Sequence, residues 1–233
     1  MNRLDEIRKQ EEISHTTIYT QKELFKPGSW LEKPVKTIID IIPLLDYKKE
    51  LNILDLGCGV GRNAIPIALE FKESNCHIDC IDILALSINL LKKYSYEYGI
   101  SNCINGIVSS IEDYNITLNK YNLIIAISAL EHIDTRDNLL RKLYEIKEGL
   151  KNNGIVCILM NSNIEEKDIE TNEKLLPQFE CNLSDEDLVQ MTNNVFVNFK
   201  VLTKTLKKQK FIIPRDNRMI EMKTDVFTYV ARK

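Results

Sequence analysis

Long apolar runs are missing from this sequence of 233 residues. No stretch approaches the roughly 18–20 apolar residues that a membrane-spanning helix needs, and the N-terminus carries mixed charges where a secretory signal would be apolar. An excess of one charge is also missing, because 31 basic and 34 acidic residues give a net charge of −3, whereas nucleic-acid-binding domains are usually strongly basic. We therefore expect no membrane partner and no DNA partner.

Paired cysteines are absent as well. The six cysteines are scattered, and no Cys-x-x-Cys motif suggests a zinc or redox site. We interpret them as small buried side chains of a protein in a reducing compartment, and expect a cytoplasmic protein without a metal.

Glycine is scarce and unevenly placed. Three of the eight glycines are Gly57, Gly59 and Gly61, and none follows Gly154. Because no Gly/Ser/Pro-rich linker, repeat or low-complexity segment divides the chain, we expect one domain over residues 1–233. Its expected parts are an N-terminal helical extension or flap (1–47), a cofactor-binding core (48–160), a lid-like segment (161–198) and a C-terminal strand pair (199–233).

Short apolar runs alternate with helical patterns between residues 51 and 160. Continuous apolar runs are typical of strands that are buried on both faces, and repeated strand–helix units indicate a parallel sheet. Residues 199–213 and 225–231 resemble strands with no helix between them, which favours an antiparallel pair. The pattern predicts an α/β fold with a doubly wound, mostly parallel seven-stranded sheet of the Rossmann-like kind. The expected strands of the core cover residues 52–56, 76–81, 103–108, 122–127 and 155–160, and the expected helices cover 62–72, 84–98 and about 135–151.

The glycine cluster follows the first predicted strand, where backbone and helix amides can approach a ligand closely. Asp82 ends the second strand, about 20 residues further on, where a carboxylate can accept both hydroxyls of a ribose. The third glycine of a dinucleotide fingerprint would be residue 62, which is Arg62, and no Gly-Lys-Ser/Thr phosphate loop exists. The motif therefore favours a nucleoside cofactor without a pyrophosphate, with a dehydrogenase as the alternative.

Leu54-Asp55-Leu56-Gly57-Cys58-Gly59-Val60-Gly61 resembles the first motif of the class I S-adenosylmethionine-dependent methyltransferases, and Asp82 matches their second acidic position. The resemblance covers about residues 50–160 and includes three further segments, which are 110–113, 121–133 and 150–154. Asn152 and Asn153 replace the proline and glycine that are more usual there. Within the family, residues 59–63 and 227–233 are most similar to the tellurite-resistance methyltransferase group.

The resemblance implies S-adenosyl-L-methionine as the cofactor and S-adenosyl-L-homocysteine as the product. It also implies a role for each matching residue. The methionine part would be held by Asp55 and by the backbone of Gly57, Cys58, Gly59 and Gly61, the ribose by Asp82, and the adenine by Ile83, Ser110 and Ile111, while Ser128 would face the methyl group.

Methyl transfer from a sulfonium is an in-line displacement that depends mainly on positioning, and a base is needed only when the nucleophile arrives protonated. His132 is the candidate base, and the alternative is a histidine that packs locally. Trp30 belongs either to a flap that closes over the cofactor and excludes water, or to a buried anchor of the N-terminal extension. Glu180 either lines a substrate pocket or belongs to a plain loop.

The acceptor is expected to be a small molecule. Ile127-Ser128-Ala129-Leu130 stands where enzymes that methylate nucleobases or protein amides carry Asn/Asp-Pro-Pro-Tyr. Eight basic residues against two acidic ones in residues 200–223 keep RNA or protein as an alternative acceptor. A non-catalytic S-adenosylmethionine sensor or scaffold is the alternative of another class. A monomer or a homodimer is expected.

Overall fold

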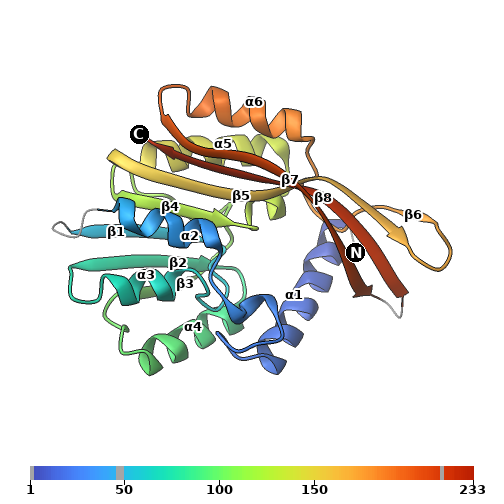
Figure 1. Cartoon of the computed structure of the whole chain (residues 1–233), viewed down its shortest axis with the longest axis horizontal. Helices are drawn as coiled ribbons and strands as arrows, with labels where there is room; N and C mark the ends of the chain where they lie inside the picture. The colour runs from blue at the N-terminus through green and yellow to red at the C-terminus, as the bar shows by residue number, and fades with distance from the viewer. Residues whose placement is uncertain (1–2, 46–49, 216–217) are drawn as a thin grey trace.

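The computed structural model describes residues 3–45, 50–215 and 218–233 and is built around one mixed β-sheet (Figure 1). The strand order is β3-β2-β1-β4-β5-β8-β7, and β6 pairs with β5 outside this path. The strands are β1 (Leu51–Leu56), β2 (Cys76–Asp82), β3 (Ile104–Val108), β4 (Tyr121–Ile127), β5 (Leu150–Asp168), β6 (Lys174–Leu175), β7 (Lys200–Arg215) and β8 (Arg218–Arg232). The helices are α1 (Arg3–Gln21), η1 (Trp30–Glu32), α2 (Lys36–Ile41), η2 (Ile42–Leu44), α3 (Ala64–Glu70), α4 (Ala85–Glu97), η3 (Leu130–His132), α5 (Arg136–Gly149) and α6 (Asp185–Val195).

The predicted α/β fold is confirmed. Strands β1 to β5 are parallel, and β8 and β7 add the antiparallel pair. The strand order reverses between β1 and β4, because β1 pairs with β2 on one side and with β4 on the other. Ligands of open α/β sheets bind beyond the carboxyl ends of the strands at such a switch point.

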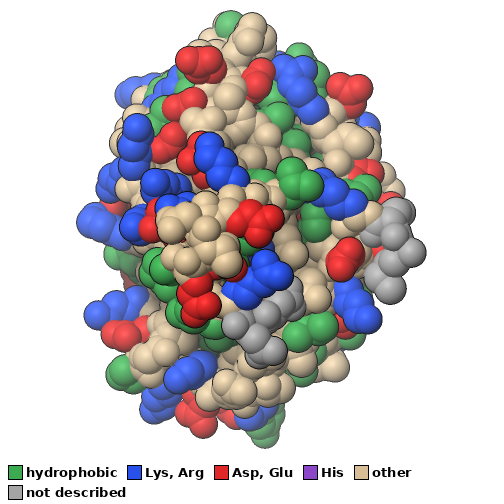
Figure 2. Space-filling view, turned by 90° about the vertical axis from the view of Figure 1, so that its right-hand side faces the viewer, with side chains coloured by type: hydrophobic (Ala, Val, Ile, Leu, Met, Phe, Trp, Pro, Cys, Tyr) green, Lys and Arg blue, Asp and Glu red, His purple; other side chains and the backbone are tan. Residues whose placement is uncertain are grey.

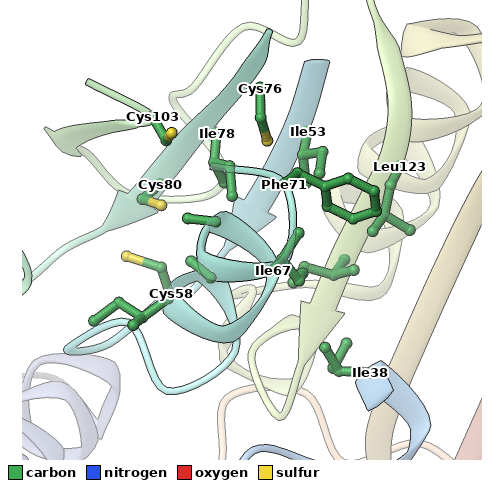
Figure 3. Close-up of a cluster of buried hydrophobic side chains, with 14 of the residues drawn as sticks. Ile38, Ile53, Cys58, Ile67, Phe71, Cys76, Ile78, Cys80, Cys103 and Leu123 are labelled. Atoms are coloured by element: carbon green, nitrogen blue, oxygen red, sulfur yellow. The ribbon is translucent and has the colours of Figure 1, made fainter. Parts of the chain in front are cut away.

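Helices cover both faces of the sheet, with α5 and α6 on one side and α2, α3 and α4 on the other (Figure 1). Their ends follow the sequence signals. Thr135 caps α5 by accepting a hydrogen bond from the amide of Asn138, and Gly99 follows α4 with a φ of +66°. All six cysteines are free and buried, and four of them pack among isoleucine and phenylalanine side chains in the core (Figure 3).

Strand β5 continues beyond residue 160, where its prediction ended. Residues 161–168 leave β4 and stay paired with β8, and together with 206–215 of β7 and 218–226 of β8 they form an extension that we call the arm (Figure 1). The first part of the expected lid segment is therefore a strand of the sheet. Seven of its eight residues are polar, and its backbone pairs with β8 on one edge and β6 on the other.

The N-terminal extension lies against the loops at the carboxyl ends of the strands. The guanidinium of Arg3 in α1 donates to the carbonyl groups of Pro177 and Phe179, and Arg8 bonds Glu112 after β3. Within the described part of the chain, no helix combines the length and the apolar character that crossing a bilayer requires.

Candidate active site

A cavity of about 1480 Å³ opens at the carboxyl ends of the central strands. Small-molecule sites usually measure about 300–1,000 Å³, so this one has room for two ligands side by side. The predicted site residues that line it are Trp30, Gly57, Cys58, Gly59, Asp82, Ile83, Ser110, Ile111, Ser128 and His132. Asp55 and Gly61 are not part of its wall and lie behind it.

The glycine loop after β1 is held in a tight turn that depends on glycine. Gly57, Gly59 and Gly61 have φ values of +74°, +54° and +91°, which side-chain-bearing residues rarely adopt. A Cβ atom on Gly57 would lie 2.4 Å from the Cβ of Ala129, and one on Gly61 would lie 2.4 Å from Cδ1 of Leu91. The loop can therefore follow this path only with glycine at these positions, and within it the amides of Gly57 and Cys58 donate to the carbonyl of Ile81.

Asp82, at the end of β2, connects the glycine loop to the next turn. Its Oδ2 accepts a hydrogen bond from the amide of Gly59 at 2.8 Å, and its Oδ1 accepts one from the amide of Leu84 at 2.9 Å. Burial raises the pKa of this carboxyl, and these two amides counteract that effect. Each oxygen retains a second lone pair, so the carboxylate can still accept ribose hydroxyls.

Asp55 is almost fully buried in β1, and its Oδ2 has no hydrogen-bond partner among the described residues. Burial first, and then the charge of Asp82, raise the pKa of Asp55 to about 8. A buried acceptor without a hydrogen-bond partner is unfavourable, so we expect a ligand to supply a donor to this oxygen. The ammonium group of a methionine moiety on the glycine loop would be such a donor, and its charge would favour the ionised form of Asp55, so the residue fits the predicted cofactor.

Replacing Asp55 by asparagine is expected to remove a pH dependence of stability. In the wild type the unfolded carboxyl ionises near pH 4 while the folded one stays protonated to about pH 8, so stability falls over that interval by up to about 1.4 kcal/mol per pH unit. Asp55→Asn should thus gain stability over the wild type as the pH rises from 5 to 8. Urea unfolding at both pH values measures this, and an equal loss of stability in both proteins would contradict it.

The side of the cavity beyond β2 and β3 suits a flat apolar ring. Ile83 is 54% exposed, and Ile111 lies partly buried on the cavity wall. Ser110 caps the turn there, because its Oγ donates to Asp113 at 2.7 Å and accepts from the amide of that residue. The structure thus brings the three residues predicted for adenine to one side of the cavity.

Ser128 follows β4 in a strained backbone conformation, with a φ of +51°. Its amide donates to the carbonyl of Leu159 in β5 at 2.7 Å, which fixes the residue between the two strands. Such conformations occur mainly where a site requires them. Ser128 lies on the cavity wall, next to the residue that closely approaches Gly57.

Three rings of the N-terminal extension cover the glycine loop. Tyr19 and Trp30 have ring centroids 5.9 Å apart, and His15 lies 5.5 Å from Tyr19. Trp30 is 46% exposed, and the guanidinium of Arg62 lies 5.4 Å from the centroid of its ring. Buried residues such as Tyr19, rather than Trp30, therefore anchor the extension to the core.

His132 bridges two carboxylates at the mouth of the cavity. Its Nε2 lies 2.9 Å from Glu11 of α1 and its Nδ1 lies 3.0 Å from Glu180, while Arg8 of α1 lies 3.6 Å from Glu180. Burial alone would lower the pKa of the imidazole, but the two carboxylates outweigh it and raise that pKa well above its usual value. We call His132, Glu11, Glu180 and Arg8 the clasp.

The clasp fits a charged imidazolium rather than a metal. The ligand atoms of its histidine and glutamates lie within 4.8 Å of one another, but the carboxylates face different ring nitrogens, whereas a metal is bound through one. The role of His132 as a base stays a prediction, and in this arrangement both of its nitrogens have partners. Glu180 lines the cavity, and Glu11 and Arg8 are members that the sequence reading missed.

The clasp predicts that α1 detaches at high pH. A histidine with a raised pKa stabilises the folded arrangement fully below its ordinary pKa, and this contribution is lost as the pH rises through the raised value. Each pH unit by which the pKa of His132 is raised corresponds to a change of about tenfold in the equilibrium constant for the opening of α1. The charged neighbours Arg8, Glu11, Glu131 and Glu180 surround the ring.

Hydrogen exchange of the α1 amides, corrected for intrinsic rates, measures this opening between pH 6 and 10. We expect a pH-dependent loss of protection in the wild type that His132→Gln removes. His15→Gln, on α1 itself, is the control and should retain it. An unchanged pH profile in His132→Gln would contradict the clasp.

The fold and the glycine loop define a doubly wound α/β protein with a cavity at the switch point of its sheet. Residues 53–154 match the family described as the methyltransferase domain. The structure is similar to that of TehB from Haemophilus influenzae, with a TM-score of 0.64 and 18% identity over 96% of this chain and 67% of that one. It is also similar to YcgJ from Bacillus subtilis, with a TM-score of 0.60 and 12% identity over 85% of this chain and 98% of that one.

Two curated relatives match the same region. Malonyl-[acyl-carrier protein] O-methyltransferase 1 of Ilyobacter polytropus is 33% identical over 99 residues, which are 42% of this chain and 35% of that protein. Ubiquinone biosynthesis O-methyltransferase of Rickettsia canadensis is 32% identical over 110 residues, or 47% and 42% of the two chains. The chain thus spans less than half the length of these relatives. Over residues 53–154 the chain matches the methyltransferase-domain family and is similar to these two methyltransferases.

Proposed function

We propose that this chain transfers the methyl group of S-adenosyl-L-methionine to a small molecule. The observation that carries the proposal is the unpartnered, buried Oδ2 of Asp55 behind a glycine loop that Asp82 holds open. These groups fit the two ends of the cofactor, its ammonium and its ribose. When bound, the cofactor supplies a methyl group on a sulfonium, a good leaving group for an in-line displacement.

The residues of the chain would act mainly by positioning. The backbone of the glycine loop and Asp55 would orient the methionine part, Asp82 the ribose, and Ile83 and Ile111 the adenine. Tyr19 and Trp30 would cover the cofactor and exclude water. Ser128 would border the transferred group, and His132 could accept a proton only after one carboxylate of the clasp has left it.

A small acceptor is supported by the shape and the charges of the site. Several of the basic residues near the C-terminus are paired with carboxylates inside the arm, where Arg215 bonds Glu166 and Lys210 and Lys223 bond Glu221. The face toward which the arm points shows side chains of both signs interspersed, rather than one basic patch for RNA (Figure 2). The named relatives include enzymes of ubiquinone biosynthesis, and we infer a comparable acceptor size.

Transfer of a labelled methyl group from S-adenosylmethionine to a panel of phenols, thiols and amines tests the proposal. We expect label in at least one acceptor and none with Asp82→Ala. Cofactor binding without transfer to any member of the panel would instead favour the sensor or scaffold. The cytoplasmic location and the monomeric or dimeric state stay predictions.

A further inference from the structure

The cavity is larger than the cofactor site because the arm adds a second, apolar wall. This wall consists of Phe211, Ile213 and Pro214 of β7 and Met222 and Val226 of β8, all of which line the cavity. Met222 and Val226 are mostly buried, whereas Phe211 is 41% exposed. An exposed aromatic side chain within an apolar wall is typical of a site that a ligand covers.

The strand register places all of this wall except Pro214 on one face of the arm. Phe211 pairs with Met222, and Asn161 of β5 pairs with Val226, so their side chains share a face. The opposite face carries Lys208, Lys210 and Lys223, which line a separate hollow. The arm is therefore amphipathic, with its apolar face toward the cavity.

The wall begins beside the residue predicted to face the methyl group. The amide of Ser128 donates to the carbonyl of Leu159, and two residues further along β5 Asn161 pairs with Val226. Asn161 is fixed there, because its amide group donates to the buried Glu131 at 2.6 Å. From Val226 the wall continues along the arm to Met222 and Phe211.

An ion pair joins two strands of the arm. Both terminal nitrogens of Arg215 donate to the carboxylate of Glu166, at 2.6 and 2.9 Å, and the Glu166 side chain is fully buried. A bidentate pair of this kind fixes geometry as well as adding energy. The wall is thus a preformed surface, and His132 and Glu180 of the clasp are among the polar groups of the same cavity.

We propose that the acceptor is an amphipathic molecule with a hydrocarbon or aromatic body. Its body lies on the wall formed by Phe211, Met222 and Val226, and its nucleophilic heteroatom lies at the polar inner end near Ser128. This inference rests on the proposed function, since it names the acceptor of the same site.

Titration of the protein, saturated with S-adenosylhomocysteine, with 4-ethyl-, 4-butyl- and 4-hexylphenol in a calorimeter tests the wall. Burial of each methylene should increase affinity about fourfold. Phe211→Asp should flatten this increase and leave the affinity for S-adenosylhomocysteine unchanged. Leu206→Asp is the matched control, because Leu206 lies on the same strand, is 44% exposed and does not line the cavity.

An affinity that does not depend on chain length, or equal effects of the two variants, would overturn the proposal. If the proposed function itself is wrong, the experiment gives a different result. In that case S-adenosylhomocysteine does not bind, while the alkylphenol series measured without it still shows whether the wall binds apolar molecules. Binding to the wall alone would reject the acceptor role and leave an apolar ligand site.

Discussion

Gly57→Ala is expected to abolish cofactor binding. A left-handed backbone with a φ of +74° disfavours alanine by about 1–2 kcal/mol. The new Cβ would also lie 2.4 Å from the Cβ of Ala129, so the two loops must move apart, which adds about 1–3 kcal/mol. Because the displaced loops include Gly57 and Ser128, which line the cavity, we expect a loss of affinity for S-adenosylhomocysteine of about a hundredfold or more, measured by calorimetry.

Gly99→Ala is the matched control for this variant. Gly99 has a similar φ of +66°, but a Cβ there would meet nothing within 4 Å. The Gly99→Ala variant should have a lower melting temperature through backbone strain alone, and its affinity for S-adenosylhomocysteine should be unchanged. Equal affinities of the two variants would contradict the role given to the contact between Gly57 and Ala129.

Asp82→Ala should weaken cofactor binding to a similar degree. The substitution removes the carboxylate that holds the amides of Gly59 and Leu84, and with it the acceptors for the ribose hydroxyls. Hydrogen bonds to a charged group contribute about 1.5–3 kcal/mol each, so losing two ribose contacts predicts a decrease in affinity of about a hundredfold or more. Calorimetry with S-adenosylhomocysteine measures the change.

Asp79→Ala controls for the loss of an aspartate from β2. Asp79 lies on the same strand and accepts hydrogen bonds from Asn105, Lys120 and Tyr121, but it does not line the cavity. It should destabilise the protein without changing cofactor affinity. Loss of affinity in both variants would mean that Asp82 acts only through the stability of the sheet.

The core of the fold could be predicted because its signals are local. Continuous apolar runs such as residues 123–127 directly indicate buried strands, and the glycine cluster marks a turn with three positive φ values. Parallel pairing then brings Asp82 and the glycine loop together, since both follow neighbouring strands. The residues predicted for the cofactor therefore lie in or directly behind one cavity.

The arm and the clasp could not be predicted, because each depends on contacts between distant segments. Glu11 and His132 meet only when α1 lies across the loop after β4. The polar residues from Asn161 to Asp168 resemble a loop until β8 provides a partner strand, and Arg215 neutralises Glu166 from a position 49 residues away. No local pattern records these pairings.

Thermal unfolding with S-adenosylmethionine, S-adenosylhomocysteine, NAD or no ligand tests the central claim most directly. A ligand at 100 times its dissociation constant adds about 2.7 kcal/mol of stability, which corresponds to roughly 5–11 °C for a chain of this size. We predict such a shift with both adenosyl ligands and none with NAD. A shift with NAD alone would contradict the methyltransferase assignment of the site.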